Sequence, residues 1–156
     1  MMTDPQQSLS SAPSAPVMAR ILGYAGALPF LGCVVAGGLG VDIAGLDFSH
    51  LLIGYAAIIL SFLGGLHWGR VAASGAPDSS AGRWLIWSVI PSLIGWAALF
   101  LPAQLAALVL ILCFLAALMI DLKLIADQIW QGWMRGLRLH LTLVAVASLL
   151  SLFVWI

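Results

Sequence analysis

The chain has 156 residues, of which 63% are hydrophobic and only 8% are charged, whereas a soluble domain carries about 25% charged residues. Its six Asp, with no Glu, balance its six Lys and Arg, so the net charge indicates no nucleic-acid partner. This composition excludes a soluble globular protein and indicates a chain that is built into a lipid bilayer.

The chain begins with a polar segment and continues as a series of long apolar runs. Residues 1–19 are rich in Ser, Pro, Ala and Gln and have too little apolar content to fold, so we expect a disordered cytoplasmic tail. Lipid offers no partner for free backbone groups, so each apolar run must be helical. About twenty helical residues cross a hydrocarbon layer of about 30 Å. Residues 20–156 are therefore predicted to form an all-α integral membrane bundle of five transmembrane helices, over Ile21–Gly40, Leu51–Val71, Trp84–Leu101, Leu105–Leu124 and Leu137–Ile156.

The basic residues predict how the bundle is oriented. The first and third connections between the predicted helices contain no Lys or Arg, and all basic residues fall beside the other helix ends: Arg20, Arg70, Arg83, Lys123, Arg135 and Arg138. Basic loops stay on the cytoplasmic side of a membrane. We therefore predict a cytoplasmic N-terminus, a periplasmic C-terminus and a multi-pass location in a bacterial inner membrane.

Tryptophans cluster near the helix ends. We expect Trp84, Trp87, Trp130, Trp133 and Trp155 to anchor the chain at the headgroup level, where indole rings are favoured. Trp96 is too deep for that role and is expected to pack between helices or to line a cavity. The alternation of apolar and polar residues after Asp121 predicts that the fourth helix continues to Gly132, either along the headgroups or packed on the bundle.

Small residues recur every four positions in the second predicted helix, at Ser61, Gly65 and Gly69. Such a ridge lets another helix approach closely, so we expect it to pack against a helix of this chain, of a second copy or of another membrane protein. Pro91, like Pro29, removes a backbone hydrogen bond and is expected to bend its helix. Cys33 and Cys113 lie in apolar runs and are expected to be small apolar fillers.

Four polar residues share one depth near the cytoplasmic side: His67, Asp121, Arg138 and His140. Ionisable groups inside a membrane are costly and by default indicate function. Asp121 is expected to pair with Arg138, and the histidines to complete a polar cluster that binds an anionic headgroup, a quinone head or a proton. The alternative for His67 is a neutral imidazole that is hydrogen-bonded to another helix. Trp68 and Trp96 complete the candidate ligand-binding set.

No catalytic motif is present: the chain has no Walker-type loop, HExxH, CxxC or nucleophile elbow. We therefore assign no catalytic residue and expect neither a metal nor a cofactor. The expected surroundings are the lipid bilayer and other membrane proteins, with no nucleic acid.

The run YAAIILSFLGGLHWG, followed by SVIPSLIGWAALFLP, resembles the family of membrane proteins catalogued as domain of unknown function 3429 (DUF3429), which includes relatives of transmembrane protein 69. The resemblance spans most of Ile21–Ile156. It implies an inner-membrane protein and carries over no catalytic residue. The family-like positions are Ser61, Gly64, Gly65, His67, Trp68, Gly69, Pro91 and Trp96.

Three functional hypotheses follow. The first is a non-enzymatic accessory or assembly factor of a membrane complex, such as a respiratory complex. The second is a binding or transport protein for a hydrophobic ligand (a lipid, a quinone or a tetrapyrrole) in an intramembrane pocket. The third, which the absence of catalytic motifs disfavours, is a membrane enzyme that uses His67 and Asp121.

Overall fold

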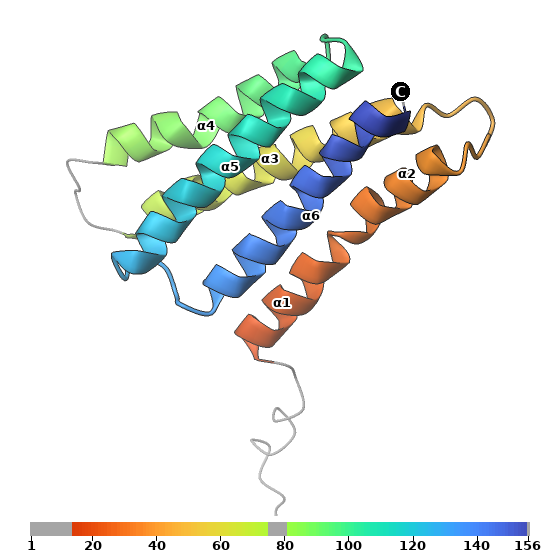
Figure 1. The fold of residues 1–156 in the computed structure, drawn as a ribbon. Coiled ribbons are helices and arrows are strands. Elements are labelled where there is room, and N and C mark those ends of the chain that lie inside the picture. The colour runs from red at the N-terminus through yellow and green to blue at the C-terminus, as the bar shows by residue number, and fades with distance from the viewer. Residues whose placement is uncertain (1–13, 75–80, 156) are drawn as a thin grey trace, which may run out of the picture.

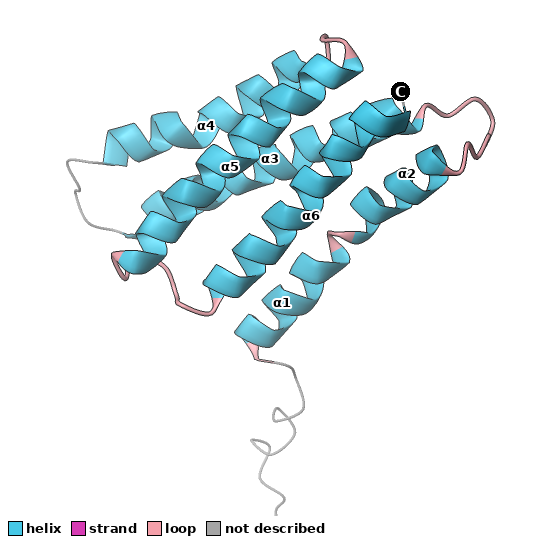
Figure 2. Cartoon of the chain, viewed as in Figure 1, coloured by secondary structure: helices cyan, strands magenta, loops and turns pink. Residues whose placement is uncertain are grey.

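The computed structural model describes residues 14–74 and 81–155, and in this part of the chain all regular secondary structure is helical (Figure 2). Most of the predicted tail (residues 1–13), the residues 75–80 and the final residue lie outside the described residues. The helices are α1 (Ala15–Ala25), α2 (Leu28–Gly38), α3 (Phe48–Ser74), α4 (Ala81–Ala98), α5 (Ala103–Ala126) and α6 (Met134–Trp155).

The first predicted span is two helices in the structure, because Pro29 interrupts it. Pro29 has no backbone N–H to donate to the carbonyl four residues earlier, at Ala25, and is best tolerated in the first turn of a helix. Accordingly, α1 ends at Ala25 and Pro29 lies in the first turn of α2. The hydroxyl of Tyr55, on α3, donates a hydrogen bond of 2.8 Å to the carbonyl of Gly26, so this backbone group at the break has a hydrogen-bond partner. At the other end, α1 begins at Ala15, so the prediction that the disordered tail extends to residue 19 is wrong.

The spans run in alternating directions along one bundle axis (Figure 1). One end of the bundle holds the starts of α1, α4 and α6 and the ends of α3 and α5; the loop between α2 and α3, the α4–α5 turn and the end of α6 lie at the opposite end (Figure 1). All six Lys and Arg of the chain lie within five residues of a helix end of the first group, whereas Asp42 and Asp47 lie in the α2–α3 loop. The bundle is therefore basic at one end only.

The core runs between α3, α5 and α6, with contributions from α2 and α4. Its members are apolar and almost fully buried, among them Leu52, Leu60, Leu110, Phe114 and Leu149. Cys33 and Cys113 are free and pack at the edge of this core. They have the role of small fillers that the sequence indicates.

Four helical stretches are long and apolar enough to cross a membrane: Pro16–Gly38, Phe48–Ala73, Ala103–Ala126 and Met134–Val154. The first stretch contains both α1 and α2. Helix α4 is shorter, with 18 residues, and contains Arg83, Pro91 and three tryptophans, which lower its apolar character. It packs against α3 along its length and also contacts α5.

Helices α3 and α4 approach each other closely at two glycines, Gly64 of α3 and Gly95 of α4. A side chain at Gly64 would collide with the backbone carbonyl of Ser88, and one at Gly95 would lie 3.3 Å from the Cα of Ala57. Pro91 is buried beside Gly64 in this contact.

The predicted ridge lies on a different face of α3. A Cβ atom added at Gly65 or Gly69 would meet nothing within 4 Å, and the hydroxyl of Ser61 bonds to the carbonyl of Ala57 in its own helix. The expectation that this ridge packs against another helix of the chain is therefore wrong. The periodicity identified a smooth stripe but not the face that points inward, and self-association through the stripe stays a prediction.

Helix α5 ends at Ala126, before the predicted end at Gly132. Gln128 adopts a left-handed conformation (φ 57°), and the N–H groups of Ile129 and Trp130 both bond to the carbonyl of Leu124, at 2.9 and 3.1 Å. These bonds cap the helix and reverse the chain. The predicted extension is therefore a turn that folds Trp130 back onto the bundle.

Candidate functional site

A buried ion pair joins α5 to α6. Asp121, on α5, is 1% exposed, and Arg138, on α6, is 4% exposed. The Nε of Arg138 donates a hydrogen bond of 2.6 Å to Oδ2 of Asp121, and Nη2 lies against the same oxygen. A charge inside a bundle requires such compensation, because isolated burial is very unfavourable. This is the pairing that we expected from the shared depth of the two residues.

His67, on α3, is the third member of the buried group. Its Nε2 lies 3.2 Å from Oδ1 of Asp121, and its side chain is 2% exposed. Its ring stacks with the indoles of Trp84 (centroids 5.6 Å apart) and Trp130 (5.1 Å apart). Within the described residues, its Nδ1 is buried and has no hydrogen-bond partner. We call His67, Asp121 and Arg138 the buried polar triad.

Arg70 lies one helical turn beyond His67 and extends the same assembly. Its guanidinium carbon is 4.9 Å from the centre of the Trp84 ring, a distance typical of a cation–π contact. Its Nε and Nη2 are buried without a hydrogen-bond partner in the described part of the chain. The sequence identified Arg70 only as one of the basic residues that set the orientation, and Trp84 and Trp130 only as headgroup anchors. Trp84 reaches His67 and Arg70 through the packing of α4 on α3. Trp130 reaches His67 through the chain reversal after α5, which has no recognised sequence signal.

The other predicted site residues do not join the triad. His140 is exposed, and its Nδ1 lies 2.9 Å from the hydroxyl of Tyr24, on α1. Successive helical residues point about 100° apart, so two residues separate His140 from the face of Arg138 by about 200°. The expectation that both histidines complete one cluster is therefore wrong, although all these residues do share one end of the bundle.

Trp68 and Trp96 point away from the bundle. Trp68 is 53% exposed, and Trp96 is 62% exposed and packs edge-to-face on Phe100 with centroids 5.1 Å apart. Trp96 follows Gly95, whose face of α4 meets α3, and so occupies a different side of that helix. Trp96 thus neither lines a described cavity nor packs between helices, because depth in a span does not determine which way a side chain faces.

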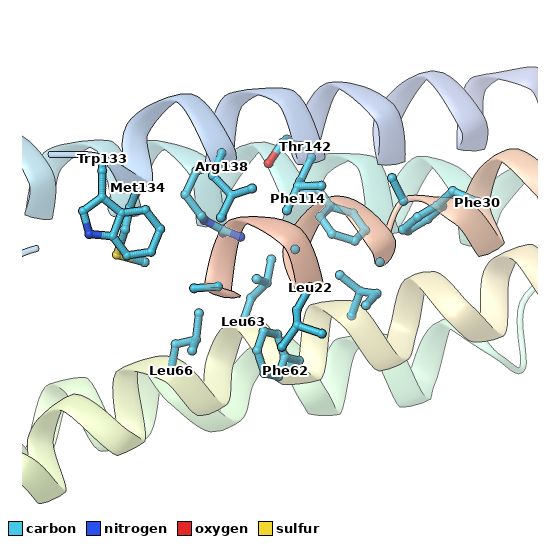
Figure 3. A pocket seen from close by; sticks show the side chains of 17 residues that line it. Leu22, Phe30, Phe62, Leu63, Leu66, Phe114, Trp133, Met134, Arg138 and Thr142 are labelled. Carbon is cyan, nitrogen blue, oxygen red and sulfur yellow. The ribbon is translucent and has the colours of Figure 1, made fainter. Parts of the chain in front are cut away.

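An apolar cavity of about 400 Å³ lies beside the triad, between the α1–α2 pair, α3, α5 and α6 (Figure 3). Its walls are aliphatic and aromatic and include Leu22, Phe30, Phe62, Leu63, Leu66 and Phe114. Arg138 and Thr142 bring polar groups to it from α6. The guanidinium nitrogens of Arg138 lie among the lining side chains (Figure 3), so this residue belongs to both the triad and the cavity.

The exposed part of the lining shows where the cavity opens. Leu22, on α1, is 64% exposed and Phe62, on α3, is 61% exposed, and both line the cavity. Helix α1 packs against α6, whereas α2 packs against both α3 and α6. The cavity therefore opens sideways between α1 and α3, on the outer surface of the bundle.

The lining of the cavity offers few donor atoms. In the described residues, no group of three or more His, Cys, Asp or Glu is placed to hold a metal ion. The site instead combines an apolar wall with a guanidinium and a hydroxyl. Such a combination of a mostly apolar wall and a few polar groups is typical of pockets for small organic molecules.

Comparisons with known proteins agree with the membrane character of the chain. Transmembrane protein 69 of Xenopus tropicalis is 34% identical over 142 residues, which cover 88% of this chain and 54% of that protein. Transmembrane protein 69 of Mus musculus is 31% identical over 94 residues, which cover 60% of this chain and 38% of that protein. The chain thus spans about half the length or less of these curated relatives. No solved structure matches. The model of the family described as protein of unknown function (DUF3429) matches residues 15–154, and the chain belongs to that family.

Proposed function

We propose that this chain is a membrane-embedded binding protein for a hydrophobic small molecule, which occupies the cavity beside Arg138. The observation that carries the proposal is the cavity itself: about 400 Å³ of apolar space with a nearly fully buried guanidinium at its wall. Ligand pockets in proteins have volumes of about 300–1,000 Å³, a mostly apolar lining and a few polar groups that orient the ligand.

The proposed setting is a bilayer that the chain crosses five times, with the basic end of the bundle in the cytoplasm. Two observations support it. Helix α4 runs antiparallel to its neighbours (Figure 1), and the basic residues lie at one end of the bundle, as cytoplasmic ends do. The bacterial inner membrane stays a prediction. In this setting the sideways mouth between Leu22 and Phe62 faces lipid, so a hydrophobic ligand reaches the cavity from within the bilayer.

One experiment tests ligand binding directly. The chain is purified in mild detergent and extracted with organic solvent, and the extract is analysed by mass spectrometry for a molecule present in stoichiometric amount. Ala27 lines the cavity, so Ala27→Phe places a ring inside it, whereas Ala25→Phe, at an exposed position that does not line it, is the matched control. The ligand is expected in the unaltered chain and in Ala25→Phe and is expected to be lost from Ala27→Phe. Equal amounts in all three proteins, or none in the unaltered chain, would contradict the proposal.

A role as an accessory or assembly factor is the second candidate, and one observation favours it. The faces of Gly65 and Gly69 meet nothing within 4 Å in this chain, although small residues at this spacing are suited to helix contacts. Gly65→Leu combined with Gly69→Leu would block a partner helix there. Affinity purification is expected to lose a membrane partner, or a second copy of the chain, with this variant. Unchanged co-purification would remove the stripe as the contact.

A further inference from the structure

We propose that the ligand of this cavity is an uncharged amphiphile whose head presents a carbonyl oxygen to Arg138 and whose hydrocarbon tail runs toward Phe30. This inference rests on the proposed function and adds the chemical class of the ligand. The carbonyl head can come from an isoprenoid quinone or from a neutral acyl ester lipid, which share this chemistry.

The hydrogen-bonding capacity of Arg138 requires an acceptor. A guanidinium has five N–H donors and no acceptor. Oδ2 of Asp121 accepts the hydrogen bond from Nε and also lies against Nη2, whereas no described residue accepts a hydrogen bond from Nη1. Because the same side chain lines the cavity, a ligand oxygen placed there would satisfy a donor that the protein leaves unmet. An unsatisfied buried donor is costly, so this need selects for an acceptor.

The charges of the buried polar triad determine which acceptor fits. Within the triad, the carboxylate of Asp121 already neutralises the positive charge of Arg138. A carboxylate head would therefore leave one uncompensated negative charge in an apolar site, and an ammonium head would lie beside Arg138 without a free counter-ion. An uncharged carbonyl accepts a hydrogen bond from the guanidinium and adds no charge. A tetrapyrrole with two carboxylates fits poorly for the same reason.

The shape of the cavity places the head and the tail. The lining residues of α6 extend from Met134 to Thr142, eight steps that span about 12 Å at 1.5 Å per residue. Trp133 and Met134 lie at one end, beside Arg138, and Phe30 lies at the other (Figure 3). A length of about 12 Å is less than half of a hydrocarbon layer of about 30 Å. The cavity therefore holds the head and the first part of a tail, and a longer tail leaves through the mouth beside Leu22.

A ligand series with a constant tail tests the head class on the unaltered chain. The protein in detergent is titrated with decylubiquinone, monodecanoylglycerol, decanoate and decylammonium, and the bound fraction is measured by native mass spectrometry. At least one of the two carbonyl ligands is expected to bind about ten-fold or more tightly than either charged ligand. Preference for the quinone or for the ester identifies the source of the head. Tighter binding of decanoate or decylammonium overturns the head assignment while leaving a binding function intact, whereas no binding of any of the four overturns the proposed function as well.

A pair of variants then tests Arg138 itself. Asp121→Leu with Arg138→Met replaces the ion pair by apolar side chains of similar size, a change that buried pairs often tolerate. It is expected to lower the affinity for the preferred carbonyl ligand by about ten-fold or more. Arg135→Gln, at an exposed position of the same helix outside the cavity, is expected to bind normally. A double variant that keeps full affinity would overturn the assignment, and the ligand series on the unaltered chain decides the matter if that variant does not fold.

Discussion

Asp121 keeps its carboxylate inside the bundle because side chains from two other helices compensate it. Arg138 supplies a charge-assisted hydrogen bond, and His67 brings a ring nitrogen to 3.2 Å from the second carboxylate oxygen. The depth of these residues in their spans was enough to predict the Asp121–Arg138 pair. The rotation of each helix was not available from one sequence, so the same reasoning wrongly placed His140 in the cluster.

Removing the charge of Asp121 is expected to destabilise the fold strongly. Asp121→Asn leaves the buried guanidinium of Arg138 without its counter-ion, and breaking a buried pair in this way costs about 3–5 kcal/mol. The free energy of unfolding, measured by denaturant titration in mixed micelles, reports this cost. Asp127→Asn is the control, because Asp127 is exposed just beyond the end of α5 and surface changes usually stay within about 0.5 kcal/mol. Equal unfolding free energies for the two variants would show that the pair does not stabilise the bundle.

Asp47 performs a different task at the opposite end, where it caps α3. Its Oδ1 accepts hydrogen bonds from the N–H groups of Ser49 (2.8 Å) and His50 (3.2 Å), and its Oδ2 lies 2.6 Å from Nδ1 of His50. The side-chain contact with His50, followed by that with Ser49, lowers the pKa of Asp47 from 3.8 to about 2. Asp47→Ala is expected to cost about 1 kcal/mol, as the loss of an N-cap does.

The sign of the pH dependence follows from that lowered pKa. A carboxylate whose pKa is lower in the folded state stabilises the fold above its unfolded pKa, and this contribution disappears as the pH falls through the folded pKa. The cap is therefore expected to contribute fully above pH 4 and to be lost between pH 3.8 and about 2. Hydrogen exchange of the Ser49 and His50 amides, compared between the unaltered chain and Asp47→Ala, measures it. A difference between the two proteins that is already gone at pH 5 would contradict this assignment.

At the scale of the elements, the contact between α3 and α4 depends on which glycine faces inward. Glycines at Gly64, Gly65 and Gly69 lie within two turns of α3, and the spacing of the last two favoured them as the contact. The buried side chains of α3 instead follow a stripe through Leu60, Leu63 and His67, and Gly64 lies on this stripe. A search for small residues alone cannot distinguish the two faces, since lipid-facing positions are also free of charge.

Two single substitutions test which of Gly64 and Gly65 faces α4. Gly64→Ala is expected to destabilise the bundle by about 1–3 kcal/mol or more, as overpacking does, because its Cβ collides with the Ser88 carbonyl. Gly65→Ala meets nothing within 4 Å and is expected to be neutral or stabilising by up to about 1 kcal/mol, since Ala is the better helix former. Unfolding in mixed micelles provides the measurement. A reversed order would mean that α4 packs on the Gly65 face.

The helix boundaries show what local sequence controls. The existence of each long apolar helix was predictable from length and hydropathy, as the spans at Phe48–Ala73 and Ala103–Ala126 confirm. The break between α1 and α2 was signalled in the sequence by Pro29, which was expected only to bend a continuous helix. The end of α5 was missed, because the left-handed Gln128 interrupts a pattern that still reads as amphipathic. The stacking of Trp130 on His67 depends on that turn and was therefore missed with it.

At the scale of the whole molecule, the basic end and the buried polar triad lie together. His67, Asp121 and Arg138 sit near the bundle end that holds every Lys and Arg, and the cavity extends from there toward Phe30 (Figure 3). A ligand head bound at Arg138 would thus lie near one membrane surface and its tail in the hydrocarbon. The sequence alone predicted the charge asymmetry, whereas the cavity depends on which helices α1 and α2 contact, which one sequence does not give.

The passage of α4 across the membrane is the step on which this orientation depends, and cysteine labelling tests it. Cys33 and Cys113 are first replaced by Ala, and single cysteines are introduced as Ile43→Cys, Pro102→Cys or Gln131→Cys, all at exposed loop positions. A membrane-impermeant maleimide is applied to intact cells of a bacterial host. Five crossings place Ile43 and Pro102 outside and Gln131 inside, so the first two cysteines are expected to react and the third only after lysis.

The alternative leaves a distinct pattern. If α4 stayed on the cytoplasmic surface, α5 and α6 would both reverse, so Pro102→Cys would be protected and Gln131→Cys would react in intact cells. Ile43→Cys would react in both cases and so confirms that the reagent reaches the outer face. The five-crossing result is expected because α4 packs antiparallel along α3, which is itself long and apolar enough to cross a membrane (Figure 1). The uncharged α4–α5 turn then lies on the same side as the acidic α2–α3 loop, as the distribution of basic residues requires.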